Sequence, residues 1–173
     1  LLLVVGITRL PETLPTERRL PARPAASFQA YLGLFRDPFY LIMVLVAGML
    51  FATIFSYVSG SPFVLQELYG LTPQTFAVVF GINSLGMILA TQLNPRLVAS
   101  FGPERVLTAG LIGALTSAVA LLIVALTSAG GLIGLLIPLW FMIACCGIAF
   151  PNAPTIALGR HGRTAGTAAA RAA

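Results

Sequence analysis

The sequence predicts an all-α, polytopic transmembrane helical bundle, and three observations lead to this prediction. Of the residues, 58% are hydrophobic and only 9% are charged, whereas an ordinary soluble domain carries about 25% charged residues. Four apolar segments are each long enough to cross a bilayer as a helix, which takes about 20 residues. The loops between these segments are alternately rich in arginine and free of basic residues. We therefore expect four complete spans, with a partial membrane helix at each end of the chain.

The N-terminal part is predicted to hold the end of one membrane helix and a cytoplasmic loop. Residues 1–8 are apolar, but as a helix they rise only about 12 Å, against a hydrocarbon core of about 30 Å. Residues 9–38 are polar and rich in proline, which blocks a continuous helix. Within them, Ser27–Phe35 has apolar residues at helical spacing. This stretch is either a short interfacial helix or the first turns of the next span.

The first two complete spans are predicted at residues 39–59 and 76–93. Neither contains a charged residue, and Pro38 suits the start of a helix because its missing N–H is no loss there. Between the two spans, Tyr57–Gln74 contains Gly60, Pro62 and Gly70 and is interpreted as a joint. The second span carries polar side chains, which need partners in lipid and should face protein or water.

The third and fourth spans are predicted at residues 106–126 and 132–158. In the third, small residues recur at spacings of three and four, which lets another helix approach closely. The fourth is longer than one crossing requires and contains three prolines, so we expect a kink around Phe150–Pro154. The adjacent thiols Cys145 and Cys146 are interpreted as small buried hydrophobic residues. Residues 159–173 are predicted to form a cytoplasmic loop and the start of a truncated helix.

Arginine counts predict the orientation of the helices. Five arginines lie in residues 9–37, two in residues 94–105 and two in residues 159–163, whereas residues 60–75 and 127–131 have no basic residue. By the positive-inside rule, the arginine-rich loops are cytoplasmic and the others lie outside. The predicted location is the bacterial inner membrane, with several passes through the lipid bilayer.

Several functional classes are disfavoured by the residues. All ten basic residues are arginines between apolar runs, a pattern that orients a membrane protein rather than binding nucleic acid. His161 is the single histidine, so no metal site is predicted. The motifs of common hydrolases and nucleotide-binding enzymes are absent. We predict neither an enzyme nor a cofactor. No Asp, Glu, Lys or Arg lies in the middle of a complete span, so the chain has no obvious proton carrier.

Two interpretations stay open for the polar residues of the spans. They line a central substrate cavity, as in transporters whose sites lie near the bilayer midplane, or they form hydrogen bonds between helices. These candidates are Tyr57, Ser59, Gln66, Asn83 and Asn152.

Other side chains carry the same ambiguity. Phe51, Phe55 and Phe80 either contact an aromatic cargo or face lipid and neighbouring helices. Glu67 is either a solvated acid of the joint or a proton site.

One long stretch resembles a known transporter family. The sequence SYVSGSPFVLQELYGLTPQTFAVVFGINSLGMILATQLNPRLV, residues 56–98, resembles the seventh and eighth helices of the major facilitator superfamily. More narrowly, it is similar to drug–proton antiporters of the bicyclomycin-resistance and chloramphenicol-efflux (Bcr/CflA) subfamily. RLPETL at 9–14, RLVASFGPER at 96–105 and PNAPTIAL at 151–158 extend the resemblance over nearly the whole chain.

The resemblance implies that the chain is a fragment of the C-terminal half of such a transporter. It would contain the end of helix six, the central cytoplasmic loop, helices seven to ten and the start of helix eleven. The intact protein would exchange protons for small amphipathic drugs, chloramphenicol- or bicyclomycin-like, by alternating access. The N-terminal half, which carries the family's proton-linked acid, is missing, so the fragment alone is expected to be inactive.

The resemblance also assigns a candidate gating loop. Arg96, Gly102 and Arg105 match the outline of a family motif that helps to control opening, although Asn94 stands at its first glycine position and its aspartate is absent. Two alternative functions remain: a major facilitator carrier for a metabolite or nutrient, and a small four-helix membrane protein with a structural or dimeric role. A dimeric multidrug transporter would need a carboxylate inside the membrane, and none of the predicted complete spans has one in its middle. A membrane-embedded enzyme would need clustered polar groups, whereas the amides here are scattered along the sequence.

Overall fold

The computed structural model describes residues 36–157 and 159. Within them it contains four helices of membrane-spanning length and no strand, which confirms the all-α membrane fold. The chain divides into two compact units, Leu1–Asp37 and Pro38–Ala173, and these helices belong to the second. The predicted partial helices at the two ends, the interfacial stretch Ser27–Phe35 and nearly all of the central loop lie outside the described residues.

The first helix runs farther than predicted. Helix α3 spans Pro38–Pro62 and continues into a π-helical stretch, η2, at Phe63–Leu68, so the predicted end at Ser59 lies inside a helix. Pro62 cannot donate to the carbonyl of Val58, and the chain accommodates this loss by widening to π-type hydrogen bonding. Tyr69 N–H donates to the carbonyl of Val64 at 3.2 Å where this stretch ends. The joint is therefore limited to residues 69–72.

The second helix absorbs most of the predicted second basic loop. Helix α4 spans Pro73–Phe101. Thr72 caps its N-terminus, because the Thr72 hydroxyl accepts a hydrogen bond from the backbone N–H of Thr75 at 3.3 Å. The predicted end at Leu93 is too early, because buried Asn94 finds a partner in another helix and Pro95 is tolerated inside the membrane helix. Only Gly102 separates α4 from the next helix.

The last two helices form a hairpin. Helix α5 spans Pro103–Thr127 and α6 spans Gly131–Ala149, within a few residues of the predicted starts. Left-handed backbone at Ser128 and Gly130 makes the turn between them. Phe150 N–H still donates to the carbonyl of Cys146 at 2.9 Å. The helix is interrupted at Pro151 and resumes over residues 152–157, inside the range where the sequence predicts a kink.

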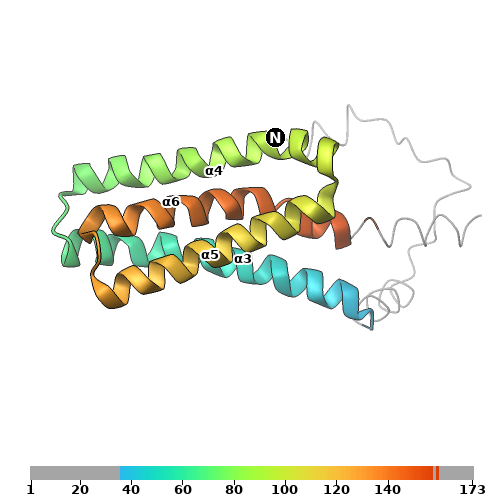
Figure 1. The fold of residues 1–173 in the computed structure, drawn as a ribbon, viewed down its shortest axis with the longest axis horizontal. Helices are drawn as coiled ribbons and strands as arrows, with labels where there is room; N and C mark the ends of the chain where they lie inside the picture. Colours follow the sequence, from blue (N-terminus) through green and yellow to red (C-terminus); the bar gives the residue numbers. More distant parts are fainter. Residues whose placement is uncertain (1–35, 158, 160–173) are drawn as a thin grey trace, which may run out of the picture. The chain divides into compact units, whose positions relative to one another are not determined.

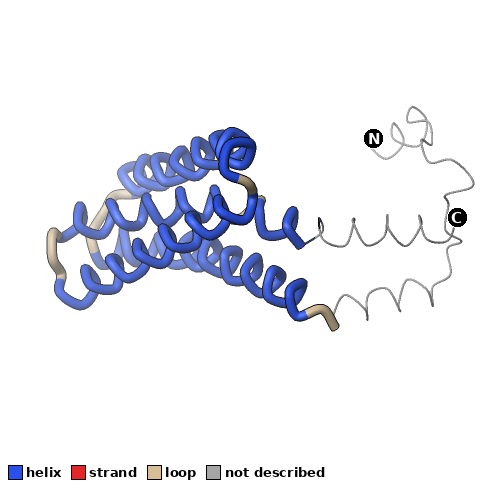
Figure 2. The backbone as a smooth tube through the Cα atoms, turned by 45° about the vertical axis from the view of Figure 1, so that its right-hand side comes forward, coloured by secondary structure: helices blue, strands red, loops and turns tan. Residues whose placement is uncertain are grey.

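Helix α6 is the central element of the bundle. It contacts α5 and α4 along much of their lengths and touches α3 at fewer positions, and Figure 1 shows it in orange between α4 and α5. The α3–α4 and α5–α6 connections lie at one end, and the α4–α5 turn lies at the other (Figures 1 and 2). Successive connections therefore lie at opposite ends of the bundle, as they do when each helix crosses the bilayer once.

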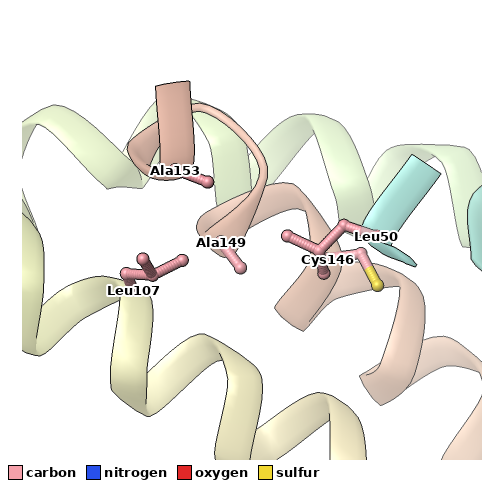
Figure 3. Packing of buried hydrophobic residues seen from close by; sticks show 5 residues of the cluster. All are labelled: Leu50, Leu107, Cys146, Ala149 and Ala153. Atoms are coloured by element: carbon pink, nitrogen blue, oxygen red, sulfur yellow. The ribbon is translucent and has the colours of Figure 1, made fainter. Parts of the chain in front are cut away.

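Small side chains let the helices approach closely around α6. Leu50 of α3 and Leu107 of α5 pack against Cys146, Ala149 and Ala153 (Figure 3). At Gly113 of α5, an added Cβ would lie 2.6 Å from Cys145 Sγ, so the small residues of this helix do face a neighbour, as predicted. Cys146 is fully buried whereas Cys145 is only partly buried, and both thiols are free.

The outward faces of the helices are apolar. Leu115 and Leu126 of α5 are 66% and 77% exposed, and many other large apolar side chains are exposed along all four helices. A water-soluble monomer rarely exposes so large a contiguous apolar surface. The bilayer is therefore the surroundings of these helices.

Candidate functional site

A hollow of about 400 Å³ lies between α4 and α6. It falls in the range of 300 to 1,000 Å³ that is usual for small-molecule sites, which are mostly apolar with a few polar groups. Asn83 is its single amide. The lining residues are Val79, Ile82, Asn83, Leu136, Ile137, Trp140 and Phe141.

Asn83 is the buried polar group of this hollow. It is 2% exposed, and its Nδ2 donates to Tyr57 Oη of α3 at 3.1 Å. Within the described residues this is the one hydrogen bond of the Asn83 side chain. An amide has two N–H donors and an accepting oxygen. Asn83 therefore keeps hydrogen-bonding capacity for a molecule in the hollow.

Aromatic packing fixes the partner of Asn83. The Tyr57 ring stacks on Phe80 of α4, with centroids 5.4 Å apart and planes at 10°, and Phe80 lies 5.8 Å from Phe76. Phe80 therefore packs against a neighbouring helix, which is one of the alternatives to cargo contact that the sequence left open. Phe51 and Phe55 are exposed and stack on each other at 6.3 Å.

Trp140 forms a wall of the hollow and was not predicted as a site residue. Its Nε1–H donates to the carbonyl of Ile82 on α4 at 3.1 Å, and Phe141 meets its ring edge-on at 5.2 Å. An added Cβ at Gly86 would lie 2.6 Å from Nε1, so glycine makes room for the indole. The sequence signal for this contact is Gly86, one helical turn after Asn83, because a glycine inside a membrane helix allows a neighbouring side chain to approach. Spacing alone cannot show that this neighbour is Trp140.

The other predicted cavity residues lie elsewhere. Ser59 is exposed and donates to the carbonyl of its own helix at Phe55, at 2.8 Å. Gln66 lies in η2, near the end of the bundle. Asn152 meets Asn94, which follows Asn83 by about 16 Å along α4. The structure therefore brings Tyr57 and Asn83 together and separates both from Ser59, Gln66 and Asn152.

Asn152 belongs to a second polar cluster, at the interruption of α6. Its Nδ2 donates to Asn94 Oδ1 and to the carbonyl of Ile148, both at 2.7 Å. Pro151 has no N–H for the carbonyl of Gly147, and the Thr91 hydroxyl of α4 lies 3.2 Å from that oxygen. The same hydroxyl lies 2.9 Å from the carbonyl of Met87 in its own helix, so its one proton is shared between Met87 and the Gly147 carbonyl that Pro151 leaves without a backbone donor. The hydrogen bond to Asn94 favours the helix-packing interpretation for Asn152.

Thr91 and Asn94 were not predicted as partners of α6. The sequence assigns Asn94 to the arginine-containing loop of residues 94–105. The available signal was the run Asn83, Gly86, Ala90 and Asn94, which repeats at helical spacing and forms the buried stripe of α4.

The candidate gating residues surround the α4–α5 turn. Gly102 has φ 82° and ψ 154°, a backbone conformation that is essentially confined to glycine. Arg96 and Arg105 lie on the two sides of this turn and are both exposed. Within the described residues, neither arginine forms an ion pair.

A bundle of membrane-length helices with apolar outward faces is a polytopic membrane protein, and the hollow beside Asn83 is of the size of small-molecule sites. The chain matches the Major Facilitator Superfamily over residues 1–172. It belongs to that family, whose members are transporters.

Two curated relatives give the same class. The chain is 32% identical over 170 residues to the "Uncharacterized MFS-type transporter YdgK" of Bacillus subtilis (strain 168), covering 98% of this chain and 42% of the relative. It is 30% identical over 159 residues to the "Bicyclomycin resistance protein homolog" of Haemophilus influenzae, covering 92% and 40%. The chain thus spans about two fifths of the length of these relatives. No solved structure gives a significant match.

Proposed function

We propose that these helices form part of a proton-coupled exporter of small amphipathic compounds of the chloramphenicol or bicyclomycin kind. The family membership supports transport, and the relative named as a bicyclomycin resistance protein homolog supports drug export. The observation that carries the proposal is the hollow itself, whose apolar and aromatic lining includes a single amide, that of the buried Asn83. Amphipathic molecules with few polar groups match such a surface.

The proposed binding mode uses the two chemistries of the hollow. The apolar body of the cargo lies against Trp140 and Phe141, and a carbonyl, hydroxyl or amide group of the cargo bonds to Asn83. Tyr57 acts as a positioning residue, because it holds the Asn83 amide through the 3.1 Å hydrogen bond. A second half of the transporter would close the site, and the two halves would rock about it in alternating access.

Proton coupling is assigned to residues outside these helices. The charged residues of the described spans are Glu67, Arg96, Glu104 and Arg105, which all lie near helix ends. A proton relay through the membrane uses ionisable groups in the span interior. We therefore expect the proton-linked acid in the other half, and expression of residues 1–173 alone to confer no drug tolerance.

The class of cargo is tested by deleting the gene for the complete transporter. The exporter proposal predicts a lower inhibitory concentration for chloramphenicol or bicyclomycin and unchanged growth on sugars and amino acids, with complementation by the complete gene. A growth defect on a nutrient, with unchanged drug tolerance, would instead establish the alternative of a nutrient carrier. Family membership favours either carrier over a purely structural four-helix protein.

A further inference from the structure

A second apolar hollow differs from the first because it carries a positive charge. It has a volume of about 350 Å³ and lies where the last turns of α4, the first turns of α5 and the later part of α6 meet. We name it the Arg105 groove. Its lining includes Leu97, Phe101, Arg105, Ala109, Cys145 and Ile148.

Arg105 is the one charged residue that lines this groove. Within the described residues no carboxylate pairs with it, and its sequence neighbour Glu104 is not part of the lining. A guanidinium group binds a phosphate through two parallel hydrogen bonds. Arg105 therefore gives the groove the chemistry to bind a phosphate monoanion or diester.

The remainder of the groove suits an acyl chain. Ala109 is exposed one turn after Arg105, so the groove continues along α5 over a small side chain. Gly110 keeps the α5 backbone close to α6, since an added Cβ would lie 3.0 Å from that of Ala149. Arg105 lies in the first turns of α5, at the depth where membrane arginines extend to the lipid headgroups. Charge and apolar surface thus follow each other in the order found in a phospholipid.

We propose that the Arg105 groove binds an acidic phospholipid, with the headgroup phosphate on the Arg105 guanidinium and one acyl chain over Ala109 toward Ile148. The occupant is a lipid because the lining includes exposed residues of membrane-length helices, Phe101, Arg105 and Ala109, and basic sites between such helices recognise anionic headgroups. The proposal does not depend on the cargo of the transporter.

Native mass spectrometry of the purified complete protein tests this site. The protein is mixed with equal concentrations of palmitoyl-oleoyl phosphatidylglycerol and phosphatidylcholine, and the ratio of the first bound lipids is measured. One basic residue near a membrane surface favours an acidic lipid by about fivefold. We expect Arg105→Gln to reduce the preference by about this factor, whereas Arg105→Lys, which keeps the charge, retains most of it.

Two matched controls separate the groove from general attraction to a basic surface. Arg96→Gln removes an exposed arginine that does not line the groove and should leave the ratio unchanged. Ala109→Phe fills the groove and should remove the first acidic lipid, whereas Thr108→Phe, at the next position outside the lining, should not. An equal loss from Arg96→Gln and Arg105→Gln, or an unchanged spectrum of Ala109→Phe, would overturn the proposal.

Discussion

At the residue scale, the interruption of α6 depends on single side chains that replace missing backbone donors. Pro151 frees the carbonyl of Gly147, and the Thr91 hydroxyl lies 3.2 Å from it. In the membrane no water is available for this carbonyl. The Thr91 hydroxyl also lies 2.9 Å from the carbonyl of Met87 in its own helix. Thr53 is the matched case without a second helix, because its hydroxyl donates at 2.9 Å only to Met49 of its own helix.

Thr91→Val keeps the shape of the side chain and removes its hydroxyl. We expect the free energy of unfolding to fall by about 0.6 kcal/mol, the average for hydrogen bonds between membrane helices, and by no more than about 1.7 kcal/mol, the largest value measured. The measurement is an unfolding titration of the purified protein with a denaturing detergent. The control Thr53→Val should change it by less, and equal effects of the two variants would exclude the proposed role of Thr91.

Gly102 is a second residue whose role is local. Its φ of 82° with ψ of 154° costs about 1 to 3 kcal/mol in a residue with a side chain. Gly102→Ala should therefore lower the melting temperature. Gly48→Ala, at a helical site where an added Cβ meets nothing within 4 Å, should leave it unchanged or raise it slightly. A melting temperature of Gly102→Ala equal to that of the unmodified protein would refute the strained-turn argument.

At the element scale, the close approach of α4 and α6 positions the candidate site. Gly147 faces the α4 backbone, where an added Cβ would lie 2.8 Å from the Met87 carbonyl oxygen. Neither backbone can move without shifting the wall that carries Trp140 and the helix that carries Asn83. The site geometry is therefore coupled to this crossing point.

Gly147→Ala should separate the two helices. We expect a loss of about 1 to 3 kcal/mol, as for other overpacked contacts, in the same detergent unfolding titration. Gly81→Ala is the matched control on α4, because an added Cβ there meets nothing within 4 Å. A stability of Gly147→Ala as high as that of Gly81→Ala would show that the helices are not held this closely.

The elements also show what could be predicted from the sequence. Span number and the region of the α6 break follow from apolar length and from proline, which act locally. The continuation of the helices beyond Ser59 and Leu93 could not be predicted. The first helix passes Pro62 into a π-helical stretch, and the buried Asn94 bonds to Asn152, 58 residues away in the sequence. Asn83 is a candidate from the sequence because it is a polar residue in an apolar span, but Trp140 is a site residue only through the α4–α6 contact. Long-range packing of this kind leaves no local signal.

At the scale of the whole molecule, the two ends of the bundle differ in charge. Arg96 and Arg105 lie beside the α4–α5 turn, whereas the α3–α4 connection holds Glu67 and no basic residue. The positive-inside rule assigns the arginine end to the cytoplasm. This orientation remains a prediction that labelling can test.

Two exposed positions test the orientation of the complete transporter. In a variant with Cys145 and Cys146 replaced by alanine, Gln74→Cys should react with an impermeant maleimide in intact cells. Ser100→Cys should react only after permeabilisation. The opposite labelling pattern would invert the topology.

The central claim is that the hollow beside Asn83 holds the cargo, and efflux by an Asn83 variant tests it most directly. Asn83→Ala removes the amide, and Ser84→Ala removes the adjacent hydroxyl, which donates at 2.8 Å only to Phe80 of its own helix. Chloramphenicol efflux is measured in cells that express the complete transporter at matched levels. Loss of a buried hydrogen-bonding group predicts a roughly tenfold lower efflux rate for Asn83→Ala and normal efflux for Ser84→Ala. Equal and unimpaired efflux by both variants would contradict the claim.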